Sequence, residues 1–254
     1  MAKKHLGQNF LFDPSILHRI IGVSGIGSGD TVVEIGPGHG TMTMLLSGAA
    51  QKVIAIELDE DLYEKLQDKT RDRGNIELVH ADALTFPYEE LGPFKVVSNI
   101  PYYITTPIIF RLIEAKDKLR SMTLTIQKEV AQRIVATPDS KEYGILSLAV
   151  QYRADPRLEF IIPRGAFRPV PKVDSAVLRM DIRREPLVRV KNEKLFFSLI
   201  RTAFSQRRKT LANSLKPTAP DIKAKLELTG IDPIRRAETL SIGEFAKLAD
   251  ALQD

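Results

Sequence analysis

The sequence predicts an α/β fold: a parallel sheet with helices on both faces, followed by a small all-α C-terminal domain. As far as about residue 136, short apolar runs typical of buried strands alternate with segments of helical spacing, which is the pattern of a parallel sheet built from β-α-β units. After residue 183 the apolar residues follow helical spacing. We therefore expect two domains, one over residues 1–183 and a smaller one over residues 184–254.

Local signals place the elements of the first domain. A helix is expected over residues 13–23, because Asp13 is a favoured N-cap residue and Pro14 is favoured at the first helical position. Apolar runs predict parallel strands, in chain order, over residues 31–35, 52–56, 76–79, 94–98 and 121–126. Helical spacing predicts helices over a segment that ends near Gly48 and over residues 59–71, 105–115 and 129–136.

The remaining segments are interpreted from their periodicity. Residues 143–153 are compatible with a helix or with a strand. Residues 157–162 and 175–182 both alternate in the manner of strands, which predicts an antiparallel pair at an edge of the sheet. In the second domain, helices are expected over residues 192–215, 222–228 and 242–252.

Composition excludes several kinds of protein. The chain of 254 residues is 43% apolar, which is ordinary for a globular protein, and no apolar run approaches the roughly 20 residues that span a bilayer. The chain has no cysteine, which excludes disulfides, thiolate zinc sites and a cysteine nucleophile. Its four histidines are scattered, so we expect no metal site. The N-terminal residues lack the apolar stretch of a secretory signal, and we expect a cytoplasmic protein that does not associate with membranes.

The positive charge is concentrated in one segment. Residues 183–216 carry ten Lys and Arg against two Asp and Glu, whereas the two flanking parts of the chain are slightly negative. This asymmetry is typical of a surface that binds a polyanion, most simply nucleic acid, although a solvated helix face has the same composition. Arg201, Ser205 and Arg208 are spaced by four and three residues, which places them on one face of the expected helix. The expected RNA contacts are Arg201, Arg207, Arg208 and Lys209.

A glycine-rich turn follows the first strand, at the edge where an open α/β sheet holds its ligands. Gly36, Gly38 and Gly40 form this turn, but Thr41 stands where a dinucleotide motif has its third glycine. Pro37 removes a backbone donor from any phosphate cradle, and the phosphate-loop lysine is absent. A nucleoside without phosphates is therefore the ligand that fits best.

Polar side chains follow the next three strands. Glu57 ends the second strand, where a carboxylate can accept hydrogen bonds from both hydroxyls of a ribose. Asp82 follows the third strand and is placed to accept from the amine of an adenine, and Asn99 follows the fourth. In this strand order, the glycine turn, the two acids and the asparagine predict a site for S-adenosylmethionine.

The tetrapeptide after the fourth strand has its own chemistry. The amide of Asn99 can both accept and donate, Pro101 stiffens the backbone, and Tyr102 offers a flat face. Together these residues predict a pocket for a planar group that carries an amine. A strand end followed by a proline-containing turn is the structural alternative.

Six longer motifs make the chain resemble a known family. They are LGQNFL (6–11), EIGPG (34–38), NIPY (99–102), QKEVA (127–131), FRPVPKVDS (167–175) and AFSQRRKTL (203–211). The chain resembles the ribosomal-RNA adenine N6,N6-dimethyltransferases, which dimethylate two adjacent adenines near the 3′ end of small-subunit (16S) rRNA. The resemblance runs nearly the full length, and the last two motifs are long and specific. The resistance enzymes that methylate a large-subunit adenine share the first motifs but are less similar in the last two.

The resemblance implies a Rossmann-like class I methyltransferase sheet in residues 1–183 and a helical, basic RNA-binding domain in residues 184–254. It implies S-adenosyl-L-methionine as the methyl donor, no metal, and a monomer that acts on small-subunit rRNA in the pre-small ribosomal subunit. The residues that would hold the cofactor are Asn9, Leu11, Gly36, Gly38, Glu57, Asp82 and Asn99.

For the chemical step, the resemblance implies the set Asn99, Ile100, Pro101, Tyr102 and Phe167. Tyr102 and Phe167 would sandwich the target adenine. Tyr103 stands where many relatives have a smaller polar residue and is expected to reshape the mouth of the pocket. A different class of function remains open, namely a ribosome-assembly or transcription factor that binds RNA on this scaffold without turnover.

Overall fold

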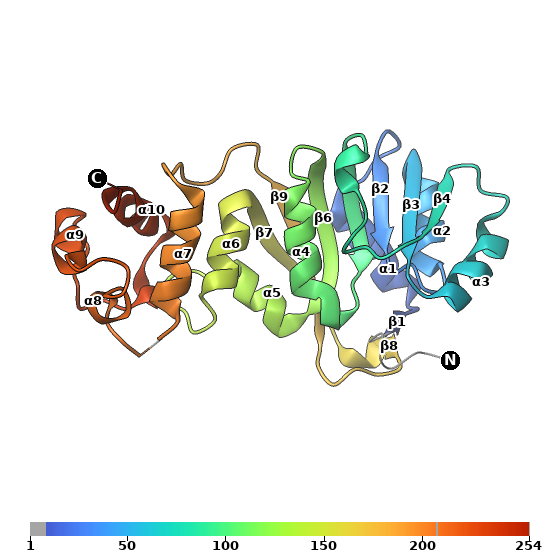
Figure 1. Cartoon of the computed structure of the whole chain (residues 1–254). Helices are drawn as coiled ribbons and strands as arrows, with labels where there is room; N and C mark the ends of the chain where they lie inside the picture. The colour runs from blue at the N-terminus through green and yellow to red at the C-terminus, as the bar shows by residue number, and fades with distance from the viewer. Residues whose placement is uncertain (1–8, 207, 254) are drawn as a thin grey trace. The chain divides into compact units, whose positions relative to one another are not determined.

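The structure, a computed structural model, describes residues 9–206 and 208–253 and divides into two compact units (Figure 1). The first unit contains the chain up to Ala131 together with Asp155–Arg184, and the second contains Gln132–Ala154 together with the chain from Glu185 onward. The expected boundary after residue 183 therefore lies next to the observed one. The segment Gln132–Ala154 differs from the expectation, because it belongs to the second unit.

A seven-stranded sheet forms the centre of the first unit. Its strands are β2 (Thr31–Ile35), β3 (Lys52–Glu57), β4 (Ile76–His80), β5 (Phe94–Asn99), β6 (Leu119–Gln127), β7 (Ala154–Ile162) and β9 (Ser175–Ile182), in the order β4-β3-β2-β5-β6-β9-β7. The first five strands in that order are parallel, and β9 is antiparallel to β6. β7 and β9 are neighbours at one edge, as expected. From β2 the chain builds the sheet outward through β3 to β4, and it then returns to add β5 on the other side of β2. The strand order therefore reverses between β2 and β5, which is the switch point where such sheets bind ligands.

Four helices of the first unit pack on this sheet. They are α1 (Pro14–Ser24), α2 (Thr41–Ala49), α3 (Glu60–Thr70) and α4 (Thr105–Glu114). Helix α4 lies in front of β6, whereas α2 lies behind β3 and β4 (Figure 1). The N-cap of α1 is Asp13, as predicted, and its side chain accepts from the Ser15 N–H at 2.9 Å. Burial of Leu17 and Ile20 against strand residues such as Val97 holds α1 on the sheet.

A second, two-stranded sheet joins parts of the first unit that are far apart in sequence. β1 (Phe10–Leu11) is antiparallel to β8 (Phe167–Arg168), with Phe10 opposite Arg168 and Leu11 opposite Phe167. Strands of two residues are too short to show a period, so the sequence did not predict this pairing. It fixes the arm that precedes α1.

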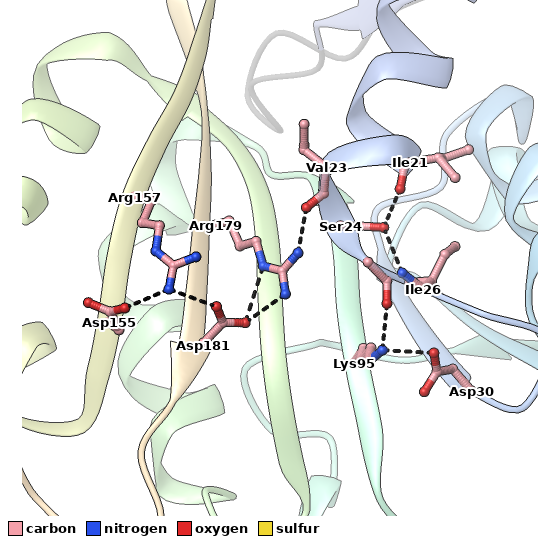
Figure 2. A network of polar contacts seen from close by, with 11 residues as sticks. Ile21, Val23, Ser24, Ile26, Asp30, Lys95, Asp155, Arg157, Arg179 and Asp181 are labelled. Carbon is pink, nitrogen blue, oxygen red and sulfur yellow. Dashed lines mark hydrogen bonds and ion pairs between the residues drawn. The ribbon is translucent and has the colours of Figure 1, made fainter.

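Arg179 on β9 connects the sheet to the C-terminal end of α1 (Figure 2). Its Nη1 donates to the Val23 carbonyl at 2.8 Å, and its Nε and Nη2 donate to Asp181 Oδ1 at 3.1 and 2.9 Å. Arg157 on β7 lies 2.8 Å from Asp155 and 3.6 Å from Asp181. A cation at the last carbonyls of a helix satisfies groups that have no partner within the helix.

Lys95 on β5 makes a second contact beyond the same helix end (Figure 2). Its Nζ donates to the Gly25 carbonyl at 2.7 Å and to Asp30 Oδ2 at 2.8 Å. Gly25 is the C-cap of α1 and has φ 64°, in the left-handed region that favours glycine. The two cations together hold the end of α1 against β5 and β9.

The second unit is helical. Its elements are α6 (Ile145–Arg153), α7 (Glu193–Phe204), α8 (Leu211–Ser214), α9 (Ile222–Leu228), the 3₁₀ turn Ala237–Thr239 and α10 (Ile242–Ala251), and the boundary between the units falls inside α5 (Lys128–Val135). The ambiguous segment 143–153 is thus a helix. Its Tyr143 and Tyr152 lie in the core with Phe196 of α7, and the Tyr143 hydroxyl donates to the Leu240 carbonyl at 3.0 Å.

The single helix expected over residues 192–215 is wrong. α7 ends at Phe204 and α8 begins at Leu211. Both of these side chains are buried, whereas the residues from Ser205 to Lys209 are all polar and offer no apolar side chain to the core. Ser205 caps α7, and its hydroxyl donates to the Thr202 carbonyl at 2.7 Å. Within the described parts of the chain, no helix has the length and apolarity that crossing a membrane requires.

Candidate functional site

A cavity of about 940 Å³, counted to its open mouth, lies at the switch point of the sheet. The cavity is lined by the residues that end β2, β3, β4 and β5 and by the arm before α1. Six of the seven expected cofactor residues line it, namely Asn9, Gly36, Gly38, Glu57, Asp82 and Asn99. The seventh, Leu11, is buried and lines a smaller neighbouring cavity of about 370 Å³.

The glycine turn after β2 is packed against the arm. Gly36 and Gly38 have φ of 66° and 58°, which L side chains rarely adopt. A Cβ on Gly38 would lie 2.8 Å from Cε1 of Phe10. The ring of Phe10 therefore closes one side of the turn, and only a residue without a side chain leaves room for it.

Glu57 joins β3 to the glycine turn. Its Oε2 accepts from the Gly38 N–H at 3.1 Å, and its Oε1 accepts from the N–H groups of Leu58 and Asp59, each at 2.9 Å. The side chain is buried, and this burial raises the pKa of the carboxyl group above its usual value, whereas the three backbone donors lower it. A carboxylate has about four acceptor positions, so Glu57 keeps capacity for hydroxyl donors from a ligand.

Asp82 and Leu58 both line the cavity. Oδ1 of Asp82 accepts from the Leu84 N–H at 2.8 Å, which fixes the carboxylate after β4. Leu58 is 46% exposed although its side chain is large and apolar. With Ala83 and Leu84 it forms an apolar wall beside two carboxylates, the combination that suits a purine with its ribose.

Asn99 ends β5 beneath the arm. Its Nδ2 donates to the Asn9 carbonyl at 2.9 Å. The Asn9 carbonyl can only accept, so the amide NH₂ of Asn99 faces it and Oδ1 points away. Oδ1 is then available to accept a hydrogen bond from another group. The Ile100 N–H donates to the Thr125 carbonyl at 3.1 Å and continues the pairing of β5 with β6.

Tyr102 begins a 3₁₀ turn, Tyr102–Ile104, and lines the cavity with Ile100 and Pro101. Its hydroxyl shares a hydrogen bond of 2.7 Å with Ser175 Oγ, at the start of β9. Burial raises the pKa of the Tyr102 phenol, so the group stays protonated at neutral pH. The hydrogen bond fixes the orientation of the ring toward the β9 side of the site.

Phe167, which is expected to stack on the target adenine, lies in the core of the first unit. Its side chain is 0% exposed and does not line the cavity. The β1–β8 pairing sets Leu11 opposite it, and the core that contains Leu17 and Ile20 covers both. Phe167 pairs with the arm through β8 and packs in this core, and its stacking on the target base stays a prediction.

Two residues outside the predicted catalytic and cofactor-binding sets also line cavities here. Tyr103 lines the large cavity and is 53% exposed. Glu34 lines the smaller cavity, is 1% exposed, and has an Oε2 that accepts no hydrogen bond from a described residue. The sequence signals for both were their positions, because Glu34 directly precedes the glycine turn and Tyr103 follows Tyr102.

The expected RNA contacts lie in the second unit. Arg201 is on the last turn of α7, and Arg208 and Lys209 lie in the turn before α8. All three are exposed, and none forms an ion pair with another residue of the described ranges. Arg207 lies outside the described residues. The shared helix face expected for Arg201 and Arg208 is wrong, because α7 ends between them.

No group of three or more His, Asp or Glu side chains within residues 9–206 and 208–253 could hold a metal ion. The polar groups around the large cavity include carboxylates, amides and backbone groups, which suit an uncharged or cationic organic ligand.

Comparisons with known proteins agree over the whole chain. A family model described as "Ribosomal RNA adenine dimethylase" matches residues 1–254. The ribosomal RNA small subunit methyltransferase A of Clostridium botulinum (strain ATCC 19397 / Type A) is 49% identical over 258 residues, covering 99% of this chain and 94% of that protein. The protein of the same name from Listeria welshimeri is 45% identical, covering 100% of this chain and 92% of that protein.

Two solved structures are similar over most of their length. A dimethyladenosine transferase from Plasmodium falciparum has a TM-score of 0.81 at 27% identity, covering 94% of this chain and 95% of that one. The 23S rRNA methyltransferase ErmE has a TM-score of 0.77 at 29% identity, covering 97% of this chain and 100% of that one.

Proposed function

The chain belongs to the ribosomal RNA adenine dimethylase family, and from this premise we propose that it methylates two adjacent adenines near the 3′ end of small-subunit rRNA. The methyl groups come from S-adenosyl-L-methionine, the products are N6,N6-dimethyladenosines, and the reaction belongs to small-subunit maturation in the cytoplasm. The first unit has the Rossmann-like sheet of class I methyltransferases. One observation supports the proposal above the others: Glu57, Asp82 and Asn99 line a single cavity at its switch point.

The cavity fits the methyl donor by the chemistry of its donors and acceptors. Glu57 and Asp82 supply acceptors for ribose hydroxyls and for the adenine amine, beside the apolar wall at Leu58. The glycine turn lets the backbone approach the amino-acid end, because neither Gly36 nor Gly38 has a side chain there. When bound, the donor supplies an electrophilic methyl group.

The residues of the chain orient the acceptor nitrogen. The lone pair of an adenine amine is delocalised into the ring, so the site must turn it toward the methyl group. Oδ1 of Asn99 and the carbonyl of Ile100 accept from the two N–H groups, while Tyr102 stacks on the base. A strong base is unnecessary, because the amine proton becomes acidic as the nitrogen is alkylated. Catalysis then rests on positioning and fixed dipoles.

The target adenine must be unpaired or flipped out to enter the cavity. The basic residues of the second unit, Arg201, Arg208 and Lys209, bind the RNA backbone and set its position. We propose that the protein acts as a monomer on the pre-small ribosomal subunit, because one chain contains both the cavity and the basic segment.

Methyl transfer to small subunits that lack these modifications tests the proposal. We expect label from S-adenosylmethionine in two adjacent adenines, and we expect Asn99→Ala to lower the rate at least about 100-fold, since it removes a group that orients the nucleophile. RNA affinity should change little. Gln67→Ala, which truncates an exposed amide on α3, is the matched control and should keep full activity.

Three outcomes would contradict the proposal. RNA binding without incorporation would favour a non-catalytic assembly factor. Label confined to a large-subunit adenine would favour an enzyme of the resistance type. Full activity in Asn99→Ala would remove the role assigned to that side chain.

A further inference from the structure

Two consecutive tyrosines leave β5 in a 3₁₀ turn, Tyr102–Ile104. With three residues per turn, successive side chains point about 120° apart. Tyr102 is held toward β9 by its hydrogen bond to Ser175. Tyr103 therefore points elsewhere, and it lines the same cavity with Leu58 and Asp82. The turn thus directs two aromatic rings to different sides of one site.

The surroundings of Tyr103 place its hydroxyl near the acidic side of the cavity. Burial, then the negative charges of Asp82 and Glu57, raise the pKa of the Tyr103 phenol. The group is therefore protonated at neutral pH and can donate. It makes no hydrogen bond to any residue that the structure describes, in contrast to the hydroxyl of Tyr102.

The apolar surface of Tyr103 is also uncovered. Tyr103 is 53% exposed and Leu58 is 46% exposed, and both line the cavity. Large apolar side chains that remain exposed around one cavity gain most from a ligand that covers them. A purine has two flat faces and can bury both surfaces at once.

We propose that Tyr103 is a cofactor-binding residue that packs its ring against the adenosine end of the methyl donor, opposite Leu58. The proposal rests on the proposed use of S-adenosylmethionine. It divides the two tyrosines between the two substrates, because Tyr102 contacts the target adenine whereas Tyr103 contacts the donor.

Calorimetric binding of S-adenosylhomocysteine, without RNA, tests the inference independently of turnover. Stacking of an aromatic ring on a base is worth about 1–3 kcal/mol, so we expect Tyr103→Ala to weaken binding at least about fivefold. Tyr103→Phe keeps the ring and should stay within about threefold of the native affinity. Phe110→Ala removes a 37%-exposed aromatic of α4 that does not line the cavity, and it should leave the affinity unchanged.

The outcomes separate this inference from the proposed function. If the native protein binds no S-adenosylhomocysteine, the proposed function itself fails. If the native protein binds and Tyr103→Ala binds equally well, the inference fails and the proposed function stands. An equal loss in Tyr103→Phe and Tyr103→Ala would overturn the ring contact. Circular dichroism and thermal unfolding of each variant check that a loss of binding is not a loss of fold.

Discussion

Glu34 is the carboxyl group that lies in the least aqueous surroundings of the first unit. Its side chain is buried within β2, and Oε2 has no hydrogen-bond partner among the described residues. Burial raises the pKa of Glu34 to about 8, with an opposing effect from the Thr43 hydroxyl and a smaller upward effect from the charge of Glu57. At neutral pH the group is therefore mostly protonated in the folded protein and ionised in the unfolded chain.

This difference predicts a pH-dependent stability. Between the unfolded pKa, near 4.5, and the folded pKa of about 8, the folded state binds more protons than the unfolded state, so stability falls as pH rises. The slope from this one group approaches about 1.4 kcal/mol per pH unit. Urea unfolding of Glu34→Gln from pH 5 to pH 8 should show a gain over the native protein that grows with pH. A constant difference across this range would show that Glu34 ionises normally in the fold.

At the scale of single residues, sequence reasoning works where a residue follows a strand. Glu57, Asp82 and Asn99 could be placed together, because the ends of parallel strands meet at one edge. The burial of Phe167 could not be foreseen, since it depends on a two-residue pairing with the arm. The direction of Tyr103 depends in turn on a 3₁₀ turn that has no sequence period of its own.

Among the elements, α1 and the β1–β8 pairing both position the arm. The arm directly precedes the N-cap of α1, and Arg179 and Lys95 hold the C-terminal end of that helix. The two cations act on carbonyls of Val23 and Gly25, which have no partner within the helix. The position of Asn9 at the cavity is therefore coupled to contacts at the opposite end of a helix.

Arg179→Ala should lower the free energy of unfolding by about 1–2 kcal/mol, because the Val23 carbonyl and Asp181 lose a charged, partly buried partner. Chemical denaturation measures the change. Arg71→Ala, which removes an arginine whose side chain is 76% exposed and paired with Asp68, is the matched control and should change stability by less than about 0.5 kcal/mol. Equal effects of the two substitutions would show that the α1 contact contributes nothing specific.

Element by element, the parallel strands and their helices could be predicted because burial of both sheet faces gives near-continuous apolar runs. The helix boundaries of the second unit were harder to predict from the sequence. Helical spacing continues from Phe204 to Leu211, but the polar residues between them leave no apolar face, and the chain turns there. Periodicity counts apolar positions and does not show where the hydrogen-bonded ladder of a helix stops.

At the scale of the whole molecule, the two units differ in charge as well as in fold. The segment 183–216 carries most of the net positive charge, and its exposed Arg201, Arg208 and Lys209 have no carboxylate partner within the described ranges. The proposed RNA contact rests on this imbalance. The sequence predicted the segment correctly as basic, but it could not show that residues 132–154 return to the same unit, because unit membership is decided by packing between distant segments.

Replacing Arg201 and Arg208 by Ala together should weaken RNA binding and reduce the slope of log affinity against log salt by about 2, roughly one for each phosphate whose cation is removed. Filter binding across a salt series measures this slope. The control is Lys223→Ala with Lys247→Ala, which removes two exposed lysines from the slightly negative remainder of the same unit. An unchanged slope in the arginine variant would identify the segment as a solvated surface.

The second unit is formed by two separate segments of the chain, which restricts how recombination can exchange it. Tyr143 and Tyr152 come from the segment before β7, and Phe196 comes from the segment after β9, yet all three share one core. A recombination event with a single junction near Arg184 would therefore combine core residues of this protein with core residues of a different one. Exchange of the unit between related genes needs matched junctions near Ala131, Asp155 and Arg184, so the two units are expected to have diverged as a linked pair.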